Sequence, residues 1–271
     1  MVKISIITIN LNNADGLNKT INSVISQTYP DIEYIIIDGA STDCSVKKIK
    51  ASEKSLHYWI SEKDNGMYEA MNKGILRSTG DYLLFLNSGD TFLNDVTLQN
   101  AIKEFSSEDI IYGNIQSIAG DNTFRKELYP DILNLSFFIT GAIPHQGMFI
   151  KKTAFSIVGL YSEKLKICSD WKFQIDSICK FKCSYKHINQ TIANFPGNGI
   201  SSLPENQSII TKEKESVLIN EYFFLKEDLQ LYLEYKKLAF YYHHSNRIKL
   251  LQKLKFLKPI LSGRFIFNYN T

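Results

Sequence analysis

The sequence predicts an α/β protein in which helices flank a mostly parallel central sheet, followed by a helical C-terminal extension. Three observations support this fold class. Apolar runs of strand length alternate with segments of helical periodicity over residues 1–105. The loops between them are short, as in units where right-handed crossovers join parallel strands. The chain has 271 residues, of which 44% are hydrophobic, and this is enough to bury a sizeable core.

The first hundred residues contain three strand–helix repeats and a fourth strand. The opening strand is a β-branched run, which is typical of a strand buried on both faces. In the helix after it, Leu17, Ile21 and Val24 recur at helical spacing, and Pro30 follows its end. Strands are predicted at residues 4–9, 32–37, 56–60 and 82–86, and helices at residues 17–25, 45–52 and 65–78.

The middle of the chain is predicted to be more irregular. Strands are expected at residues 110–115 and 192–195, and a helix opens at Ser169 with an apolar face that continues to Ile178. Residues 212–260 carry an apolar stripe at helical spacing, so we expect helices there.

Composition and short motifs exclude several classes of protein. Mean hydropathy is −0.16 and no run of 18 apolar residues occurs, so a membrane-spanning helix is not expected. The apolar start of the chain lacks a small-residue cleavage site, which favours a strand over a signal peptide. The four cysteines have no zinc-type spacing, so we expect reduced thiols in a cytoplasmic protein. Neither GxGxxG nor GxxxxGK(S/T) is present, which argues against dinucleotide and P-loop sites.

Charge is distributed unevenly along the chain. Residues 229–271 carry eight basic and one acidic side chain, whereas the 228 residues before them carry 23 basic and 27 acidic ones. Such asymmetry indicates a body followed by a basic segment that meets an anionic partner. An ordinary solvated helix pair and peripheral attachment to an anionic membrane are both compatible with this segment. No nucleic-acid-binding module is visible, so no nucleic-acid partner is expected.

Polar residues follow the carboxyl end of each of the four predicted strands. They are Thr8 with Asn10, then Asp38, Asp64 and Asp90. In parallel sheets these ends meet at one edge, where ligands bind. A single such aspartate is usually a turn or helix cap. Four clusters at one edge indicate a ligand site instead.

Four motifs occur in order along the first ninety residues. They are Ile4-Ser5-Ile6-Ile7-Thr8 with Asn12; Ser26-Gln27-Thr28-Tyr29-Pro30 leading to Asp38-Gly39-Ala40-Ser41-Thr42-Asp43; residues 61–74 from Ser61-Glu62-Lys63-Asp64 to Asn72-Lys73-Gly74; and Gly80-Asp81 running to Asn87-Ser88-Gly89-Asp90. In this combination the chain resembles the family 2 glycosyltransferases over roughly residues 3–200. The third and fourth motifs are similar to the subgroup that builds bacterial surface polysaccharides such as lipopolysaccharide, O-antigen and capsule.

The resemblance implies a fold, a reaction and a cofactor. The implied fold is GT-A, a Rossmann-like sheet flanked by helices. The implied reaction is an inverting transfer of a sugar, hexosyl or N-acetylhexosaminyl, from a nucleotide-sugar, with UDP as the expected nucleotide. The implied cofactor is a divalent metal, Mn²⁺ or Mg²⁺, and the implied acceptor is a glycan or a lipid-linked molecule.

The same resemblance divides the chain into functional parts. Residues 1–210 are expected to form the catalytic domain, with a nucleotide-binding half at 1–105 and an acceptor half at 106–210. Residues 211–271 are expected to form the basic helical extension. With lipid-linked acceptors, residues 229–271 would bring the protein to the inner face of the plasma membrane.

A set of residues matches the nucleotide-binding positions of the family. Asp38 corresponds to an aspartate that accepts from the uracil N–H, a role that suits a carboxylate because it only accepts when ionised. Asp64 corresponds to a contact with the base, and Gly66 begins a helix whose N–H groups favour anionic oxygens. The resemblance implies nucleotide binding by Thr8, Asn10, Asp38, Asp64, Gly66, Asn72, Asn87 and Ser88. Lys73 beside them is expected to be a solvated surface residue.

The segment from Asn87 to Asp90 occupies the place of the family's metal-binding DxD motif. Hard divalent ions prefer oxygen ligands, and an ion that bridges two phosphates needs only one or two carboxylates. Here Asn87 replaces the first carboxylate, so Asp90 is the expected metal ligand. This departure from the family pattern leaves the identity of the metal open.

Asp170 matches the catalytic base of the family, with Ser169 in front of it where an acidic residue is common. An inverting transfer is a single displacement, in which one carboxylate takes the proton of the acceptor hydroxyl. The pair His145-Gln146 and Trp171 are expected to contact the donor sugar or the acceptor. Residues 197–202 resemble a loop that closes over both substrates and excludes water. We therefore expect the four aspartates, 38, 64, 90 and 170, to share one cleft.

Two alternatives to the transferase stay open at this stage. A nucleotide-sugar-binding subunit of a polysaccharide assembly complex, without transfer activity, is compatible with Asn87 in place of an acidic residue. A nucleotidylyltransferase would share the fold. It would require a basic, glycine-rich loop after the first strand, which residues 12–16 do not provide.

Overall fold

The structure, a computed structural model, describes residues 1–118, 123–197 and 199–222, with scattered positions between 227 and 245. The chain divides into two units, Met1–Glu215 and Ser216–Thr271. The boundary expected after residue 210 stays a prediction. Most of the basic segment 229–271, and with it the expected membrane contact, lies outside the described residues.

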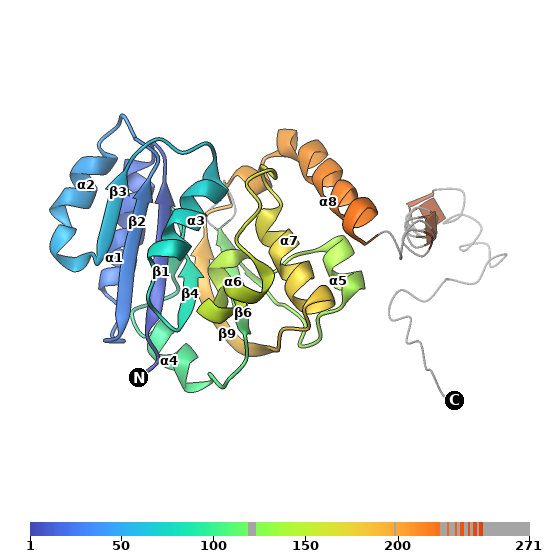
Figure 1. Ribbon diagram of the computed structural model, residues 1–271, viewed down its shortest axis with the longest axis horizontal. Helices are drawn as coiled ribbons and strands as arrows, with labels where there is room; N and C mark the ends of the chain where they lie inside the picture. The colour runs from blue at the N-terminus through green and yellow to red at the C-terminus, as the bar shows by residue number, and fades with distance from the viewer. Residues whose placement is uncertain are drawn as a thin grey trace. The chain divides into compact units, whose positions relative to one another are not determined.

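Strands and helices alternate through the first unit, as Figure 1 shows. The elements up to residue 105 are β1 (Ile4–Asn10), α1 (Ala14–Ile25), β2 (Ile32–Asp38), α2 (Ser45–Ala51), the short helix η1 (Glu53–Ser55), β3 (Tyr58–Ser61), α3 (Met67–Arg77), β4 (Tyr82–Phe85), β5 (Thr91–Phe92) and α4 (Thr97–Lys103). Those after it are β6 (Ile110–Ile118), β7 (Phe124–Glu127), α5 (Leu135–Thr140), η2 (His145–Gly147), β8 (Met148–Lys151), α6 (Lys152–Val158), α7 (Ser169–Ile175), η3 (Asp176–Lys180), β9 (Tyr185–Phe195), η4 (Ile200–Ser202), η5 (Pro204–Asn206) and α8 (Gln207–Glu221).

The nine strands of the described residues form one sheet in the order β3-β2-β1-β4-β8-β6-β9-β5, with β7 paired to β6. The first four are parallel to one another. Strand β8 runs antiparallel to both β4 and β6, whereas β6 and β9 are again parallel. The predicted α/β class and its parallel half are confirmed, and the second half of the sheet is mixed.

The register of the parallel strands aligns their polar carboxyl ends. Asn10 of β1 lies opposite Asp38 of β2, and Asp38 lies opposite Ser61 of β3. The residues that follow β3 and β4 therefore begin at the same edge of the sheet. This is the edge at which ligands bind in parallel α/β sheets.

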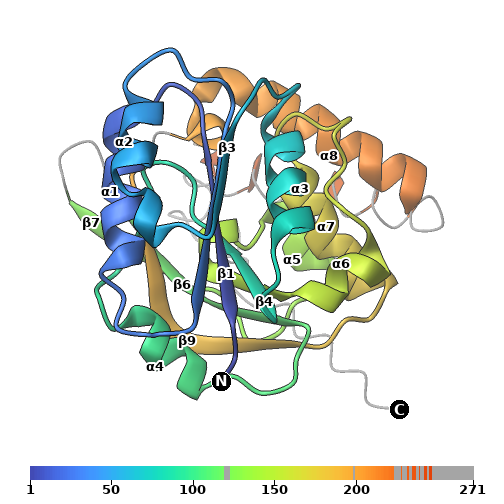
Figure 2. The same ribbon diagram turned by 60° about the vertical axis from the view of Figure 1, so that its left-hand side comes forward.

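Helices cover both faces of the parallel half. Figure 2 shows α1 and α2 on one side of the sheet and α3 on the other. Ile6 of β1 packs in the buried cluster with Leu17 and Ile21 of α1. Ile7 points to the opposite face, because successive strand residues alternate. There a Cβ on Gly74 would lie 2.4 Å from Cγ2 of Ile7, so only glycine allows α3 to approach β1 this closely.

The second half differs from expectation in several places. The strand expected at 192–195 is the end of β9. The first residues of β9 lack a clear alternation of apolar and polar side chains, because they include His187 and Asn189. The helix opened by Ser169 is α7, and η3 continues it as a π-helical turn. The short elements β5, β7, α4 and α6 were not expected from the sequence. The predicted helical stretch from 212 begins earlier, at Gln207, and lies outside the described residues for most of its length after 222.

Two further sequence-based expectations concern membrane-spanning helices and the cysteines. No helix in the described ranges is both long enough and apolar enough to cross a membrane. The four cysteines are free thiols, as expected.

Candidate active site

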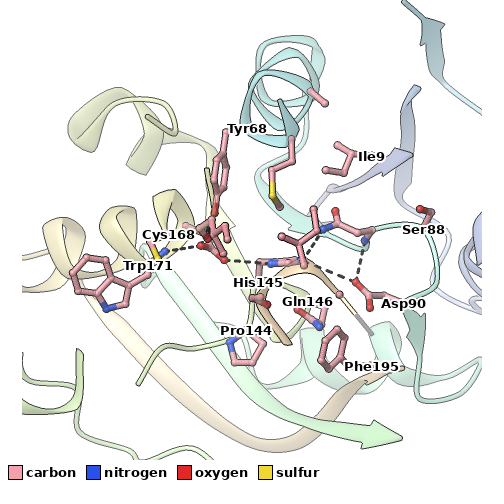
Figure 3. A pocket seen from close by; sticks show the side chains of 18 of the residues that line it. Ile9, Tyr68, Ser88, Asp90, Pro144, His145, Gln146, Cys168, Trp171 and Phe195 are labelled. Carbon is pink, nitrogen blue, oxygen red and sulfur yellow. Dashed lines mark hydrogen bonds and ion pairs between the residues drawn. The ribbon is translucent and has the colours of Figure 1, made fainter. Parts of the chain in front are cut away.

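A cavity of about 920 Å³ opens at the carboxyl edge of β1 and β4. Its walls also come from the start of α3, from η2, from α7 and from the segment after β9 (Figure 3). The volume falls within the usual range of small-molecule sites. Ten of the predicted site residues line it: Asn10, Asp64, Gly66, Asn87, Ser88, Asp90, His145, Gln146, Asp170 and Trp171.

Three predicted nucleotide-binding residues do not line this cavity. Thr8 is buried, and its hydroxyl lies 3.2 Å from that of Tyr34. The side chain of Asn72 is instead hydrogen-bonded to the backbone of Tyr161 and to the carboxylate of Glu163. Asn72 therefore fixes the segment before α7 against α3. Nucleotide binding by Thr8 and Asn72 stays a prediction, because neither residue lines the cavity.

Asp38 is the third, and its carboxylate has partners inside the protein. It accepts hydrogen bonds from Asn10 Nδ2 (2.7 Å), from the backbone and hydroxyl of Ser41 (2.9 and 2.6 Å) and from the hydroxyl of Ser61 (2.6 Å). Asp38 is fully buried and does not line the cavity. It therefore holds Asn10, which does line the cavity. The Asn10 Oδ1 oxygen is buried and has no hydrogen-bond partner among the described residues.

Asp64 lies in the cavity wall and is held by a lysine. Lys73 Nζ lies 2.6 Å from Asp64 Oδ1, 2.8 Å from Glu62 Oε1 and 3.4 Å from Glu69 Oε1. Burial raises the pKa of Asp64, and the contact with Lys73 offsets part of that rise. Lys73 was expected to be a solvated surface residue, but three carboxylates surround its ammonium group.

The turn after β4 brings two oxygen atoms that could bind a metal ion to the cavity. Asp90 Oδ2 accepts from the backbone N–H of Asn87 at 3.1 Å, and burial raises the pKa of Asp90 to about 6. The amide oxygen Oδ1 of Asn87 is buried without a partner among the described residues. A carboxylate and an amide oxygen fit a hard divalent ion whose other ligands are phosphate and water. Within the described part of the chain, no group of three or more His, Cys, Asp or Glu side chains could hold a metal by itself.

Asp170 is held on both of its oxygens. Oδ1 accepts from the backbone N–H of Trp171 (2.8 Å) and from the hydroxyl of Tyr68 (2.9 Å). Oδ2 lies 3.4 Å from Nδ1 of His145. Burial by itself raises the pKa of Asp170, but the hydrogen bond and charge of His145 hold it below its usual value. The contacts of Asp170 therefore favour the ionised form of this carboxylate, which lines the cavity.

His145 connects Asp170 to the turn after β4 (Figure 3). Its Nε2 lies 3.0 Å from Asn87 Nδ2 and 3.9 Å from Asp90 Oδ2. Burial lowers the pKa of His145, but the neighbouring carboxylates of Asp170 and Asp90 raise it above its usual value overall. One imidazole therefore links the two acidic residues across the cavity.

Two cavity residues have surroundings that the sequence did not predict. Trp171 is only 2% exposed, and its Nε1 donates to the carbonyl of Phe138 at 2.8 Å. The ammonium group of Lys214 lies 5.0 Å from the centre of its ring. Sugar stacking by Trp171 stays a prediction, because the ring is packed into the wall. The sequence did not identify Lys214 as a cavity residue, because the residues around it predict only a helix.

The segment after β9 closes one side of the cavity. Pro196, Gly199, Ile200 and Ser201 line it together with Phe195, the last residue of β9, so the loop predicted at 197–202 is adjacent to the site. Asn198 within that loop lies outside the described residues.

Comparison with known sequences identifies the family. The sequence model of "Glycosyl transferase family 2" matches residues 5–158, more than half of the chain. An uncharacterised glycosyltransferase of Mycobacterium tuberculosis is 31% identical over 214 residues, covering 76% of this chain and 79% of the relative. A "PGL/p-HBAD biosynthesis glycosyltransferase" of Mycobacterium bovis is 30% identical over 197 residues, covering 70% and 75%. These matches define the class of protein as a glycosyltransferase, and the chain belongs to glycosyltransferase family 2.

Solved structures support the same fold. Staphylococcus aureus TarS (residues 1–349) aligns with a TM-score of 0.59 at 18% identity, over 72% of this chain and 60% of that one. The chain thus spans about 60% of the TarS structure that it matches. A mannosyltransferase of Pyrobaculum calidifontis, solved with GDP-Man and Mn²⁺, aligns with a TM-score of 0.57 at 14% identity, over 74% and 59%. The fold is therefore GT-A, as predicted.

Proposed function

We propose that this protein transfers a sugar, with inversion, from a UDP-sugar to a glycan or lipid-linked acceptor in cell-surface polysaccharide biosynthesis. One observation carries the proposal. Asp64, Asp90 and Asp170 come from segments that are distant in sequence, and all three line one cavity of the right size for a nucleotide-sugar. Independent helix caps would have no reason to share a cavity.

In this proposal Asp170 is the catalytic base. Its Oδ1 is held by two donors, whereas Oδ2 has only the longer 3.4 Å contact with Nδ1 of His145, so Oδ2 is the oxygen that takes the proton of the acceptor hydroxyl. The acceptor oxygen forms its bond to the anomeric carbon while the nucleoside diphosphate leaves from the opposite face. A single displacement needs one such carboxylate and no second, nucleophilic one.

Asp90 and Asn87 would hold the divalent metal. When bound, the metal acts as a Lewis acid that stabilises the charge of the departing diphosphate. His145 lies between these residues and the base, at hydrogen-bond distance from Asn87 and Asp170. The chain itself therefore provides a connection between the leaving-group side and the attacking side of the cavity.

The nucleoside would lie between Asn10 and Asp64. The unpaired Oδ1 of Asn10 is an acceptor that an N–H of the base can satisfy, because buried acceptors are nearly always hydrogen-bonded. Asp38 lies behind Asn10 and orients it, so its contribution to nucleoside binding would be indirect.

The named relatives support the donor and acceptor classes. TarS has been solved with UDP and with UDP-GlcNAc, and the Pyrobaculum enzyme with GDP-Man and Mn²⁺. The mycobacterial relative is named for the biosynthesis of PGL/p-HBAD. With a lipid-linked acceptor the transfer would occur at the inner face of the plasma membrane.

A second candidate is a nucleotide-sugar-binding subunit without transfer activity. It is favoured by one observation, the amide of Asn87 at a position where a second carboxylate would strengthen metal binding. Such a subunit would bind the donor and leave it intact.

Substitution of the two key carboxylates separates these functions. We expect Asp170→Asn to keep donor binding and to lower turnover roughly a thousandfold, which is the usual contribution of a general base. We expect Asp90→Ala to weaken metal-dependent binding of UDP. Donor binding is measured by thermal shift with a panel of nucleotide-sugars, with and without Mn²⁺. Turnover is measured as sugar transfer to a lipid-linked acceptor fraction.

Asp15→Asn is the matched control, since Asp15 is exposed on α1 and does not line the cavity. Wild-type turnover in Asp170→Asn would remove the assignment of the base. Donor binding without any consumption of donor by the wild-type protein would favour the non-catalytic subunit.

A further inference from the structure

Tyr68 is a cavity residue that the sequence motifs do not assign. It is the second residue of α3, four positions after Asp64, and it is 2% exposed. Its hydroxyl lies 2.9 Å from Oδ1 of Asp170 and 2.5 Å from the carbonyl oxygen of Ile167. Figure 3 shows its ring reaching down toward the segment that carries Cys168. The contact joins residues 102 positions apart in the chain.

The geometry at Asp170 gives this hydroxyl a specific task. The backbone N–H of Trp171 and the hydroxyl of Tyr68 both donate to Oδ1. These two donors come from different elements, α7 and α3, so together they fix the rotation of the carboxylate. Without them the plane of the carboxylate could turn away from this orientation, because the terminal torsion of an aspartate is broad.

We propose that Tyr68 is a positioning residue for the catalytic base, holding Oδ1 of Asp170 so that Oδ2 faces the acceptor hydroxyl. This rests on the proposed function of Asp170. Tyr68 does not itself exchange a proton with the substrate. It acts through Asp170, from the helix whose first turn borders the nucleotide side of the cavity.

The second acceptor of Tyr68 suits a base that changes its protonation state. While Asp170 is ionised, the hydroxyl hydrogen points to Oδ1. After Asp170 has taken the proton of the acceptor, that hydrogen can point to the carbonyl of Ile167 instead. The buried hydroxyl then keeps a hydrogen-bond acceptor in both states, so no unpaired polar group arises during the reaction. Burial and the charge of Asp170 raise the pKa of Tyr68 well above its usual value, so it remains a neutral donor throughout.

A neighbouring tyrosine offers a matched control. The ring of Tyr161 lies 5.7 Å from that of Tyr68, centre to centre, and is also buried. Its hydroxyl has no hydrogen-bond partner among the described residues. Tyr161→Phe therefore removes the same atom from the same region without removing a contact to Asp170.

The experiment compares Tyr68→Phe with Tyr161→Phe in the full-length chain. We expect Tyr68→Phe to lower kcat about ten- to hundredfold, the usual worth of a hydrogen bond to a charged group, with the donor KM and donor affinity unchanged. We expect Tyr161→Phe to keep wild-type kcat within about twofold, because no pairing is lost. Thermal melting checks that both variants are folded.

The pH profile provides a readout that a packing defect would not move. The ionised form of Asp170 loses a donor in Tyr68→Phe, so its pKa rises and the acid limb of kcat/KM shifts to higher pH. In the Asp170→Asn background, Tyr68→Phe should have no further effect on kcat, since the residue it positions is gone.

Different results would overturn different claims. The positioning role is refuted if Tyr68→Phe keeps wild-type kcat. It is also refuted if both tyrosine variants lose kcat equally and the acid limb of their pH profiles does not move. In either case Asp170 remains the base, provided that Asp170→Asn is inactive. Wild-type turnover in Asp170→Asn would instead refute the proposed function on which the inference rests.

Discussion

In our proposal, Asn87 determines how strongly the site holds a cation. The amide nitrogen of Asn87 lies 3.0 Å from Nε2 of His145, so only its single oxygen, Oδ1, is left for a bound cation. A carboxylate has two oxygens and could serve both His145 and a cation. The asparagine therefore lowers the negative charge next to Asp90 and leaves this residue as the main anionic ligand in our proposal.

We expect Asn87→Asp to tighten Mn²⁺-dependent binding of UDP by about tenfold, because ligand charge sets the affinity of such sites. Titration calorimetry with and without Mn²⁺ measures this directly. Asn100→Asp adds the same charge on the exposed side of α4 and should leave the affinity unchanged. Equal affinities in wild type and Asn87→Asp would mean that position 87 does not face the cation.

Single residues show where sequence reasoning succeeds and where it stops. Asp64, Asp90 and Asp170 were predicted to share a cleft, and they line one cavity. The edge of the parallel sheet brings Asp64 and Asp90 together after β3 and β4, whereas Asp170 reaches the same cavity from α7. Asp38 was predicted with them, but Ser41 and Ser61 enclose its carboxylate. Hydrogen-bond partners on separate segments cannot be inferred from residue types alone. The contact of Tyr68 with Asp170 was missed for the same reason.

At the scale of elements, α8 fixes the segment that carries Asp170, the base in our proposal. The carboxylate of Glu213 accepts from three successive backbone N–H groups, those of Lys166 (2.6 Å), Ile167 (3.1 Å) and Cys168 (3.0 Å). These residues directly precede α7, on which Asp170 is the second residue. The position of Asp170 therefore depends on a helix that begins almost forty residues later in the sequence.

We expect Glu213→Ala to lower the free energy of unfolding by about 1–3 kcal/mol, the cost of leaving the partly buried N–H groups of Ile167 and Cys168 unpaired. Turnover should fall as well, because the segment before α7 loses its anchor. Glu213→Gln keeps one acceptor oxygen and should be milder in both respects. Urea unfolding and transfer assays measure the two effects.

Glu215→Ala is the control for this prediction, since Glu215 is exposed on the same helix. If Glu213→Ala unfolds at the same urea concentration as Glu215→Ala, the three hydrogen bonds do not stabilise the segment.

The elements themselves were predictable to different degrees. The strand–helix repeats up to β4 follow from periodicity, because strands buried on both faces are apolar runs and the helices between them are amphipathic. Strand β9 was predicted at a fraction of its length, since Lys186, His187 and Asn189 interrupt the apolar pattern. The reversal of β8 between β4 and β6 depends on long-range pairing, which short-range patterns do not encode.

At the scale of the whole folded unit, a buried glutamate joins β1, β2 and the turn between α3 and β4. Glu33 of β2 accepts from the hydroxyl of Ser5 (2.5 Å) and from the backbone and hydroxyl of Thr79 (both 2.6 Å). Lys3 Nζ lies 3.4 Å away. These contacts lie at the end of the sheet opposite the cavity. They hold the parallel strands in register without taking part in the site.

We expect Glu33 to make the stability of the protein depend on pH in the acid range. Burial by itself would raise the pKa of Glu33, but the hydrogen bonds from Ser5 and Thr79 lower it to about 2, from 4.5. A carboxyl whose folded pKa is depressed contributes stability above its unfolded pKa and loses that stability as the pH falls through the folded value. The shift corresponds to about 3 kcal/mol, which should be present at neutral pH and lost between about pH 4.5 and 2.

We therefore expect Glu33→Gln to lower the free energy of unfolding at pH 7 by about 3 kcal/mol and to flatten its dependence on pH in the acid range. The two proteins should approach the same stability near pH 2, where Glu33 of the wild type becomes protonated and resembles the neutral amide. Urea unfolding at pH 7, 4.5 and 3 follows this convergence. Glu104→Gln, an exposed position after α4, should unfold in parallel with wild type at each pH. A constant difference between Glu33→Gln and wild type at all three pH values would mean that shape, rather than the charge of Glu33, stabilises this end of the sheet.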